Sequence, residues 1–208
     1  MLGADVVIHS LTKFINGSSD TVGGVYCASQ EFVDDTKNVN NGACMLLGPT
    51  MDSFRSASIL KNLRTLHIRM KKHSENAMFL AERFENDGLK VKYPGLKSHK
   101  NHELMKSMMH QEYGFGGLLT VDVGSVEKAN ELMELMQTEN LGYLAVSLGF
   151  YKTLFSCSGS STSSEIPEDE RKEMGLSDGL IRFSIGLDHD IERTYQKMRE
   201  CMVKTGVL

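Results

Sequence analysis

The sequence lacks the features that would mark a membrane protein or a nucleic-acid-binding protein. No apolar run approaches the roughly 18 to 20 residues that a bilayer-spanning helix requires, so we expect no membrane partner. Basic residues are not in excess, because 23 Lys and Arg stand against 27 Asp and Glu and give a formal net charge of −4. Proteins that bind nucleic acids usually carry a dominant basic surface, and the sequence therefore disfavours such a partner.

The cysteine pattern and the spacing of possible metal ligands argue against two further classes, disulfide-linked secreted proteins and metal-binding proteins. The four cysteines have no CxxC spacing and follow no secretory segment, which predicts free thiols in a reducing compartment, the cytoplasm. Residues 99–103 hold the only cluster of metal-ligating residue types, in a polar stretch without helical apolar periodicity. We interpret that stretch as a solvated loop and predict no metal site.

What remains is the composition of a soluble globular protein. Hydrophobic residues make up 40% of the 208 positions and charged residues 24%, which is typical of a chain with one domain or one and a half. A chain of this length can bury a substantial core without disulfides or metals.

The first thirty residues predict two strands separated by a polar turn. Residues 4–8 form a short β-branched run that favours a buried strand, and residues 23–28 favour a second one. The polar residues between them begin directly after the first strand. Its carboxyl end should therefore carry Ser10, Thr12 and Lys13.

A long helical pattern follows and then gives way to a mixed one. Apolar residues recur at three- and four-residue spacings over 52–86, which predicts one long helix or two in line, ended by Gly88. From there short strands alternate with helices, so we expect a domain boundary that divides the chain into 1–86 and 87–208. Four basic residues on the helical segment predict a solvated face or, alternatively, a contact with a partner subunit: Arg64, Arg69, Lys71 and Lys72.

The second half predicts an alternation of strands and helices. Strands are expected at 90–93 and 118–123, and Ser125 should cap a helix. The serine-rich stretch 156–164 would by itself be interpreted as a flexible loop, and residues 167–175 as a short helix.

The last third predicts a strand with one buried face and a terminal helix. Residues 180–187 alternate, so the apolar side chains take one side of a strand and Arg182 projects from the other. Residues 191–204 predict an amphipathic helix.

Two side chains are candidates for chemistry. Lys13 follows a strand and has hydroxyl residues three positions and one position before it, so its amine could form a Schiff base beside an anion site. The alternative is an ordinary exposed lysine. Arg182 on a rigid strand could grip a carboxylate, or it could form a surface or interface salt bridge. Ser147 and Thr162 also carry hydroxyl groups, but no pattern around either residue indicates a function by itself.

Four ordered blocks resemble one known family. They are residues 9–20 (HSLTKFINGSSD, followed by two glycines), 63–70, 146–149 and 175–187. They resemble the Cys/Met metabolism family of pyridoxal 5′-phosphate (PLP) enzymes, which includes cystathionine lyases, cystathionine synthases and methionine γ-lyases. Within the family the serine-rich stretch is most similar to methionine γ-lyases of plants.

The resemblance implies an α/β fold and a cofactor. The chain would be the carboxyl-terminal half of a fold type I (aspartate aminotransferase-like) enzyme, with 1–86 as a partial PLP-binding large domain and 87–208 as the small α+β domain. Lys13 would form the Schiff base with PLP and move protons at the substrate's Cα and Cβ, while Ser10 and Thr12 would hold the phosphate.

The resemblance also implies a substrate and an assembly. Ser147 and Arg182 would hold the α-carboxylate of a sulfur amino acid, with Thr162 nearby. The reaction would be that of a carbon–sulfur lyase, most like the conversion of methionine to methanethiol, ammonia and 2-oxobutanoate, with cystathionine γ-synthase or cystathionine lyase chemistry as alternatives. The family assembles as homotetramers. A different hypothesis is that the chain is a truncated, non-catalytic paralogue that acts as an interaction module.

Overall fold

The chain divides into two compact units. The computed structural model describes residues 3–157, 166–167, 170 and 177–208, and its contacts separate Met1–Leu66 from His67–Leu208. This division precedes the expected boundary at residue 86 because the helix before that boundary contributes its buried side chains to the core of the second unit. The assignment of 1–86 to a cofactor-binding domain stays a prediction. No helix in the described part of the chain is long and apolar enough to cross a membrane.

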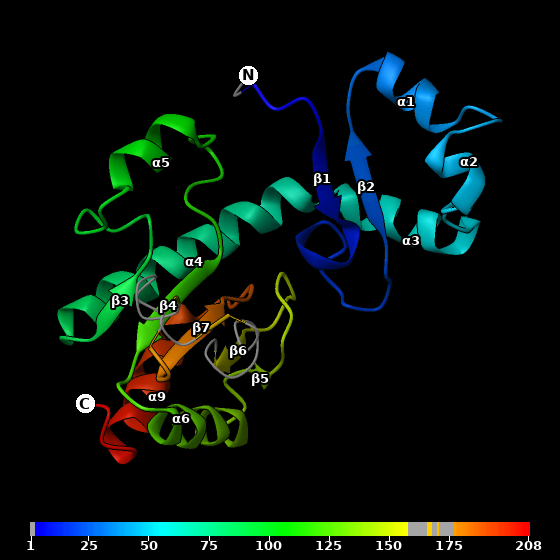
Figure 1. Ribbon diagram of the computed structural model, residues 1–208. Coiled ribbons are helices and arrows are strands. Elements are labelled where there is room, and N and C mark those ends of the chain that lie inside the picture. The colour runs from blue at the N-terminus through cyan, green and yellow to red at the C-terminus, as the bar shows by residue number, and fades with distance from the viewer. Residues whose placement is uncertain (1–2, 158–165, 168–169, 171–176) are drawn as a thin grey trace. The chain divides into compact units, whose positions relative to one another are not determined.

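The first unit, blue to cyan in Figure 1, consists of a two-stranded sheet and short helices. Its elements are β1 (Val7–Ser10), η1 (Leu11–Ile15), β2 (Gly24–Cys27), α1 (Gln30–Thr36), α2 (Ala43–Leu47) and α3 (Ser53–Leu63). The strands pair antiparallel, from Val7 opposite Cys27 to Ser10 opposite Gly24. A strand therefore exists near each predicted position, but β1 spans Val7–Ser10 and not 4–8, so Ser10 ends the strand while Thr12 and Lys13 follow it as expected.

The burial predicted for these strands is wrong. Every residue of β1 is exposed, and Ile8 reaches 77% exposure. A strand is buried only where a second layer covers it. Among the described residues of this unit, Ile59 is the one hydrophobic side chain that is buried. The β-branched run thus predicted the strand correctly but could not show what covers it.

The second unit has a mixed five-stranded sheet with the strand order β3-β4-β7-β6-β5. Its elements are α4 (Leu66–Asn86, which begins one residue before the unit does), β3 (Lys90–Lys92), α5 (His102–Met108), β4 (Leu118–Asp122), α6 (Val126–Thr138), β5 (Tyr143–Leu144), β6 (Leu154–Cys157), β7 (Leu180–Ser184) and α9 (Ile191–Lys204). Neighbouring strands run antiparallel except β5 and β6, which run parallel. The central strand of this sheet is β7.

Helices α4, α6 and α9 supply side chains to one core against a single face of this sheet (Figure 1). Phe84 of α4 lies 6.3 Å from Phe183 of β7 and 6.1 Å from Tyr195 of α9, measured between ring centroids. Alternate residues of the central strand, Ile181, Phe183 and Ile185, enter the core. The alternation read from the sequence is confirmed, and Arg182 lies on the opposite face.

The helix ends of this unit follow the sequence signals. Ser125 caps α6 by accepting a hydrogen bond at Oγ from the backbone N–H of Lys128, 3.4 Å away. Gly88, at a φ of +86°, ends α4, and the N–H of Leu89 donates to the carbonyl of Phe84 at 3.0 Å. The terminal helix α9 spans the predicted residues 191–204. The long helical pattern before Gly88 is two helices, α3 and α4.

Two predicted loops are partly regular structure. Helix α5 begins at His102, whose Nδ1 lies 2.9 Å from the carbonyl of Pro94 and whose ring stacks on Phe115 at a centroid distance of 5.2 Å. This tertiary packing outweighs the lack of apolar periodicity. Ser156 and Cys157 belong to the buried strand β6, whereas residues 158–165 lie outside the described residues.

Candidate active site

Lys13 occupies a wide turn between β1 and β2. The N–H of Asn16 donates to the carbonyl of Leu11 at 2.9 Å, so the turn closes across five residues, and the N–H of Gly17 donates to the carbonyl of Lys13 at 2.8 Å. Within this turn Lys13 has a φ of −88° and a ψ of −130°, which lies outside the helical and strand regions. Wide turns and sparsely populated backbone conformations concentrate at functional sites.

Hydrogen bonds to Gly23 fix this turn against the start of β2. The hydroxyl of Thr12 accepts from the N–H of Gly23 at 3.1 Å and faces its carbonyl oxygen at 3.4 Å. The N–H of Leu11 donates to the same carbonyl at 2.9 Å. The residue directly before Lys13 therefore anchors the turn to the neighbouring strand.

A buried asparagine fixes the other side of the turn. Asn16 is 1% exposed, and its Nδ2 donates to Oδ1 of Asp20 at 2.8 Å. This hydrogen bond lowers the pKa of the Asp20 carboxyl. From α3, the Nδ2 of Asn62 donates to Oδ1 of Asn16 at 2.8 Å. The sequence marked residues 16–20 only as turn formers, so the supporting role of Asn16 and Asn62 was missed.

The donor set around Lys13 fits a phosphorylated aldehyde such as PLP. Ser10 ends β1, is exposed, and makes no side-chain cap bond to the turn that follows. Its hydroxyl is therefore available to a phosphate, and the hydroxyl of Thr12 becomes a second donor if it turns from the carbonyl of Gly23, 3.4 Å away. Lys13 is half-buried as a residue, and its amine is the group that reacts with an aldehyde. An amine and two hydroxyls within four residues match the two functional groups of the cofactor.

Arg182 lies at the centre of the second unit's sheet, half-buried on the face opposite the core. Its Nη2 donates to the backbone carbonyl of Ser147 at 3.0 Å. Burial lowers the pKa of the Arg182 guanidinium, although a guanidinium remains charged at neutral pH. No carboxylate in the described part of the chain forms a salt bridge with it. A half-buried cation in this situation is suited to bind an anion.

The segment that contains Ser147 is anchored to the same strand. The N–H of Gly149 donates to Oγ of Ser184 at 3.0 Å, two residues along β7 from Arg182. The structure thus brings together two of the predicted substrate-binding residues, Ser147 and Arg182, through the backbone carbonyl of the serine. The third, Thr162, lies outside the described residues.

Strand pairing adds two residues that sequence reasoning missed. Thr120 of β4 and Ser156 of β6 pair with Arg182 from its two sides. Directly paired residues in a sheet share a face, so a hydroxyl residue flanks the arginine on each side. Thr120 lies in a predicted strand and Ser156 in the buried strand β6. A single sequence, however, carries no signal for which strands become neighbours.

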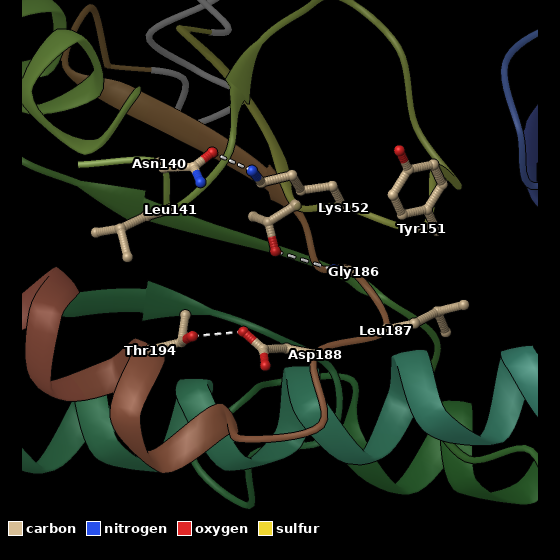
Figure 2. A pocket seen from close by; sticks show the side chains of 9 residues that line it. Asn140, Leu141, Tyr151, Lys152, Gly186, Leu187, Asp188 and Thr194 are labelled. Atoms are coloured by element: carbon tan, nitrogen blue, oxygen red, sulfur yellow. Dashed lines mark hydrogen bonds between the residues drawn. The ribbon is translucent and has the colours of Figure 1, made fainter. Parts of the chain in front are cut away.

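A separate cavity in the second unit does not contain these residues. Figure 2 shows this space of about 240 Å³, lined by residues that include Asn140, Lys152 and Asp188. Its polar groups pair with one another. Lys152 bonds to Asn140 and Thr194 to Asp188. Because these groups satisfy each other, the cavity is a weaker candidate site than the face around Arg182.

Comparison with known proteins gives consistent matches along the chain. Residues 1–195 match the Cys/Met metabolism PLP-dependent enzyme family. Methionine gamma-lyase of Arabidopsis thaliana is 43% identical over 204 residues, covering 98% of this chain and 46% of the relative. The structure superposes on cystathionine gamma synthase from Xanthomonas oryzae pv. oryzae with a TM-score of 0.84 and 31% identity, covering 99% of this chain and 52% of the other.

A further solved structure resembles the chain at lower identity. It is a putative O-acetylhomoserine (thiol)-lyase from Campylobacter jejuni containing N'-pyridoxyl-lysine-5'-monophosphate, with a TM-score of 0.82 and 26% identity over 97% of this chain. The chain spans about half the length of the curated relatives that it matches.

Proposed function

The chain belongs to the Cys/Met metabolism family of PLP-dependent enzymes, and from this premise we propose that it carries the lysine and carboxylate-binding residues of a carbon–sulfur lyase. The observation that supports this most directly is the turn around Lys13, where a half-buried lysine and two hydroxyl residues occur within four positions. The 43% identity to a methionine gamma-lyase favours methionine as the substrate. The products would then be methanethiol, ammonia and 2-oxobutanoate.

In this proposal the first unit holds the cofactor. Lys13 would hold PLP through its aldehyde, and Ser10 and Thr12 would hold the phosphate, with the Thr12 hydroxyl turning from the carbonyl of Gly23 to donate to it. When bound, PLP supplies an electron sink for negative charge that develops on the substrate. The amine of Lys13 would act as a general base at the substrate's Cα and transfer a proton at Cβ. The hydrogen bonds from Thr12 to Gly23 keep the lysine in its turn.

The second unit binds the substrate's α-carboxylate. Arg182 offers donors in a planar fork, and a fork on a rigid strand can form two parallel bonds to a carboxylate. The hydrogen bond to the carbonyl of Ser147 orients the guanidinium. Thr162 is proposed to lie nearby.

Cystathionine chemistry is the alternative within the family. A solved relative with a TM-score of 0.84 is a cystathionine gamma synthase, and another relative, 38% identical, is a cystathionine gamma-lyase. Methanethiol release from methionine, compared with cysteine release from cystathionine, distinguishes these substrates. The homotetramer and the cytoplasmic location are parts of the same proposal, and size-exclusion chromatography with light scattering tests the assembly.

The experiment that tests the proposal is reconstitution of the full chain with PLP. We expect a visible absorbance band from the cofactor joined to lysine, and borohydride reduction should leave the pyridoxyl group on the peptide that contains Lys13. Lys13→Ala should abolish both signals, whereas Lys61→Ala, at an exposed lysine in the same unit, should preserve them.

Two results would contradict the proposal. Labelling spread over several exposed lysines would show that Lys13 has no special reactivity. A chain that folds but takes up no PLP would favour the non-catalytic interaction module instead.

A further inference from the structure

Ser156 and Arg182 face each other across the two central strands of the sheet. The register of β6 and β7 pairs them directly, so their side chains share the face opposite the core. Thr120 of β4 holds the matching place on the other side of the arginine. Three polar residues therefore form one row across three strands.

Two atoms of this row are buried without a hydrogen-bond partner among the described residues. They are Oγ of Ser156, in a residue that is 4% exposed, and Nε of Arg182. Leaving a buried donor or acceptor unpaired costs about 1 to 3 kcal/mol. The acceptor and the charged donor lie at directly paired positions on neighbouring strands, so the sheet register places a possible partner beside each of these unpaired atoms.

We propose that Ser156 is a positioning residue for Arg182, whose Nε donates a hydrogen bond to Ser156 Oγ when the two Nη groups bind a carboxylate. The inference rests on the proposed role of Arg182 in holding the substrate's α-carboxylate. In the structure Nη2 is directed to the carbonyl of Ser147. A carboxylate that binds both Nη groups requires a fixed guanidinium plane, and a bond at Nε fixes that plane from behind.

Burial distinguishes Ser156 from Thr120 in this role. Thr120 is half-buried, so its hydroxyl can be satisfied by water, whereas Ser156 has lost access to solvent. Removing an unpartnered buried hydroxyl relieves a cost in the ligand-free chain. Ser156→Ala should therefore keep or raise the thermal midpoint while weakening carboxylate binding, a combination that a purely structural role does not produce.

The test follows the Nε–H of Arg182 by NMR in the full chain incubated with PLP, with L-norleucine as the probe. Norleucine has the α-carboxylate but no sulfur leaving group. In the parent chain we expect it to slow the solvent exchange of this proton. In Ser156→Ala the slowing should be lost and the norleucine affinity should fall about tenfold, as for a hydrogen bond to a charged group.

Matched variants isolate the hydroxyl. Ser156→Thr keeps an Oγ and should behave like the parent, and Thr120→Val should also leave the exchange and the affinity unchanged. Arg182→Lys identifies the signal by removing it and should abolish norleucine binding.

The outcomes separate this inference from the proposed function. If Arg182→Lys abolishes binding but Ser156→Ala matches the parent in exchange and affinity, only the positioning role is overturned. If Arg182→Lys binds norleucine as the parent does, or if the parent binds none, the carboxylate site itself is overturned and the positioning role with it.

Discussion

The two units of the chain differ in how they treat their apolar side chains. In the second unit, residues from three helices and three strands form one buried cluster that includes Phe84, Val121 and Phe183. In the first unit, large apolar side chains lie on the surface, with Phe54 at 89% exposure and Ile8 at 77%. The second unit is therefore stabilised by the burial of apolar side chains, whereas the first is stabilised mainly by backbone pairing and polar contacts.

This difference also separates the two groups of candidate site residues. Arg182 sits on a sheet whose opposite face is packed, so its backbone position follows from the core. The position of Lys13 depends on a few hydrogen bonds, from the N–H of Gly23 to Thr12 and from Asn62 to Asn16. We infer that the carboxylate-binding face is formed by the second unit alone, whereas the lysine turn needs its polar network to keep its shape.

A matched pair of phenylalanine substitutions tests this contrast between the units and should give the largest change in unfolding free energy. Phe183→Ala removes a fully buried ring from the central strand and should cost about 3 to 5 kcal/mol of unfolding free energy. Phe54→Ala, on the surface of α3, should stay within about 0.5 kcal/mol of the parent. Urea unfolding monitored by circular dichroism measures both. Equal losses would show that the two units share one core.

The same contrast explains which parts of the fold were predictable from sequence. In the second unit the spacing of apolar residues and the helix-capping residues match the side chains that pack in the core. The terminal helix at 191–204 and the strand around Arg182 were therefore predicted correctly. The strand at 4–8 was assigned as buried because its residues favour burial. Whether another layer covers a strand is not encoded in the strand itself.

Tertiary geometry explains what was missed at the candidate site. The backbone conformation of Lys13 arises from a turn fixed at both ends, and no residue-type preference indicates a ψ of −130° there. The flanking positions of Thr120 and Ser156 depend on strand order, which places these two residues beside Arg182 only after folding, although they lie 62 and 26 positions before it in the sequence. Helix α5 at His102 likewise depends on packing against Phe115.

A second prediction uses a buried tyrosine to follow the core of the second unit at high pH. Burial raises the pKa of Tyr93 to about 12, and its hydroxyl donates to the carbonyl of Gly116 at 2.8 Å. The unfolded chain releases this proton near its ordinary pKa of about 10, and the folded chain retains it. Stability is therefore fully present below pH 10 and is lost between about pH 10 and 12, by roughly 2 to 3 kcal/mol.

Tyr93→Phe should reduce this alkaline loss, measured by urea unfolding at a series of pH values. It should not remove the loss completely, because burial and a hydrogen bond to Asp87 also raise the pKa of Tyr195. Tyr151→Phe, at an exposed tyrosine, should leave the full loss in place. An unchanged pH profile in Tyr93→Phe would mean that the phenol is not enclosed by the core.

The smallest expected effect comes from two serine caps, one in each unit. Ser125 accepts from the N–H of Lys128 at the start of α6, and Ser29 accepts from the N–H of Phe32 at the start of α1. Ser125→Ala should lower the unfolding free energy by about 1 kcal/mol because α6 packs on the core, and Ser125→Asp should restore it. Ser29→Ala removes the same type of bond, but α1 has no buried residue and should fray without shifting the main unfolding transition. The two caps are chemically alike. If both variants lowered the unfolding free energy equally, α1 would unfold together with the second unit. The two units would then differ only in how exposed their apolar side chains are.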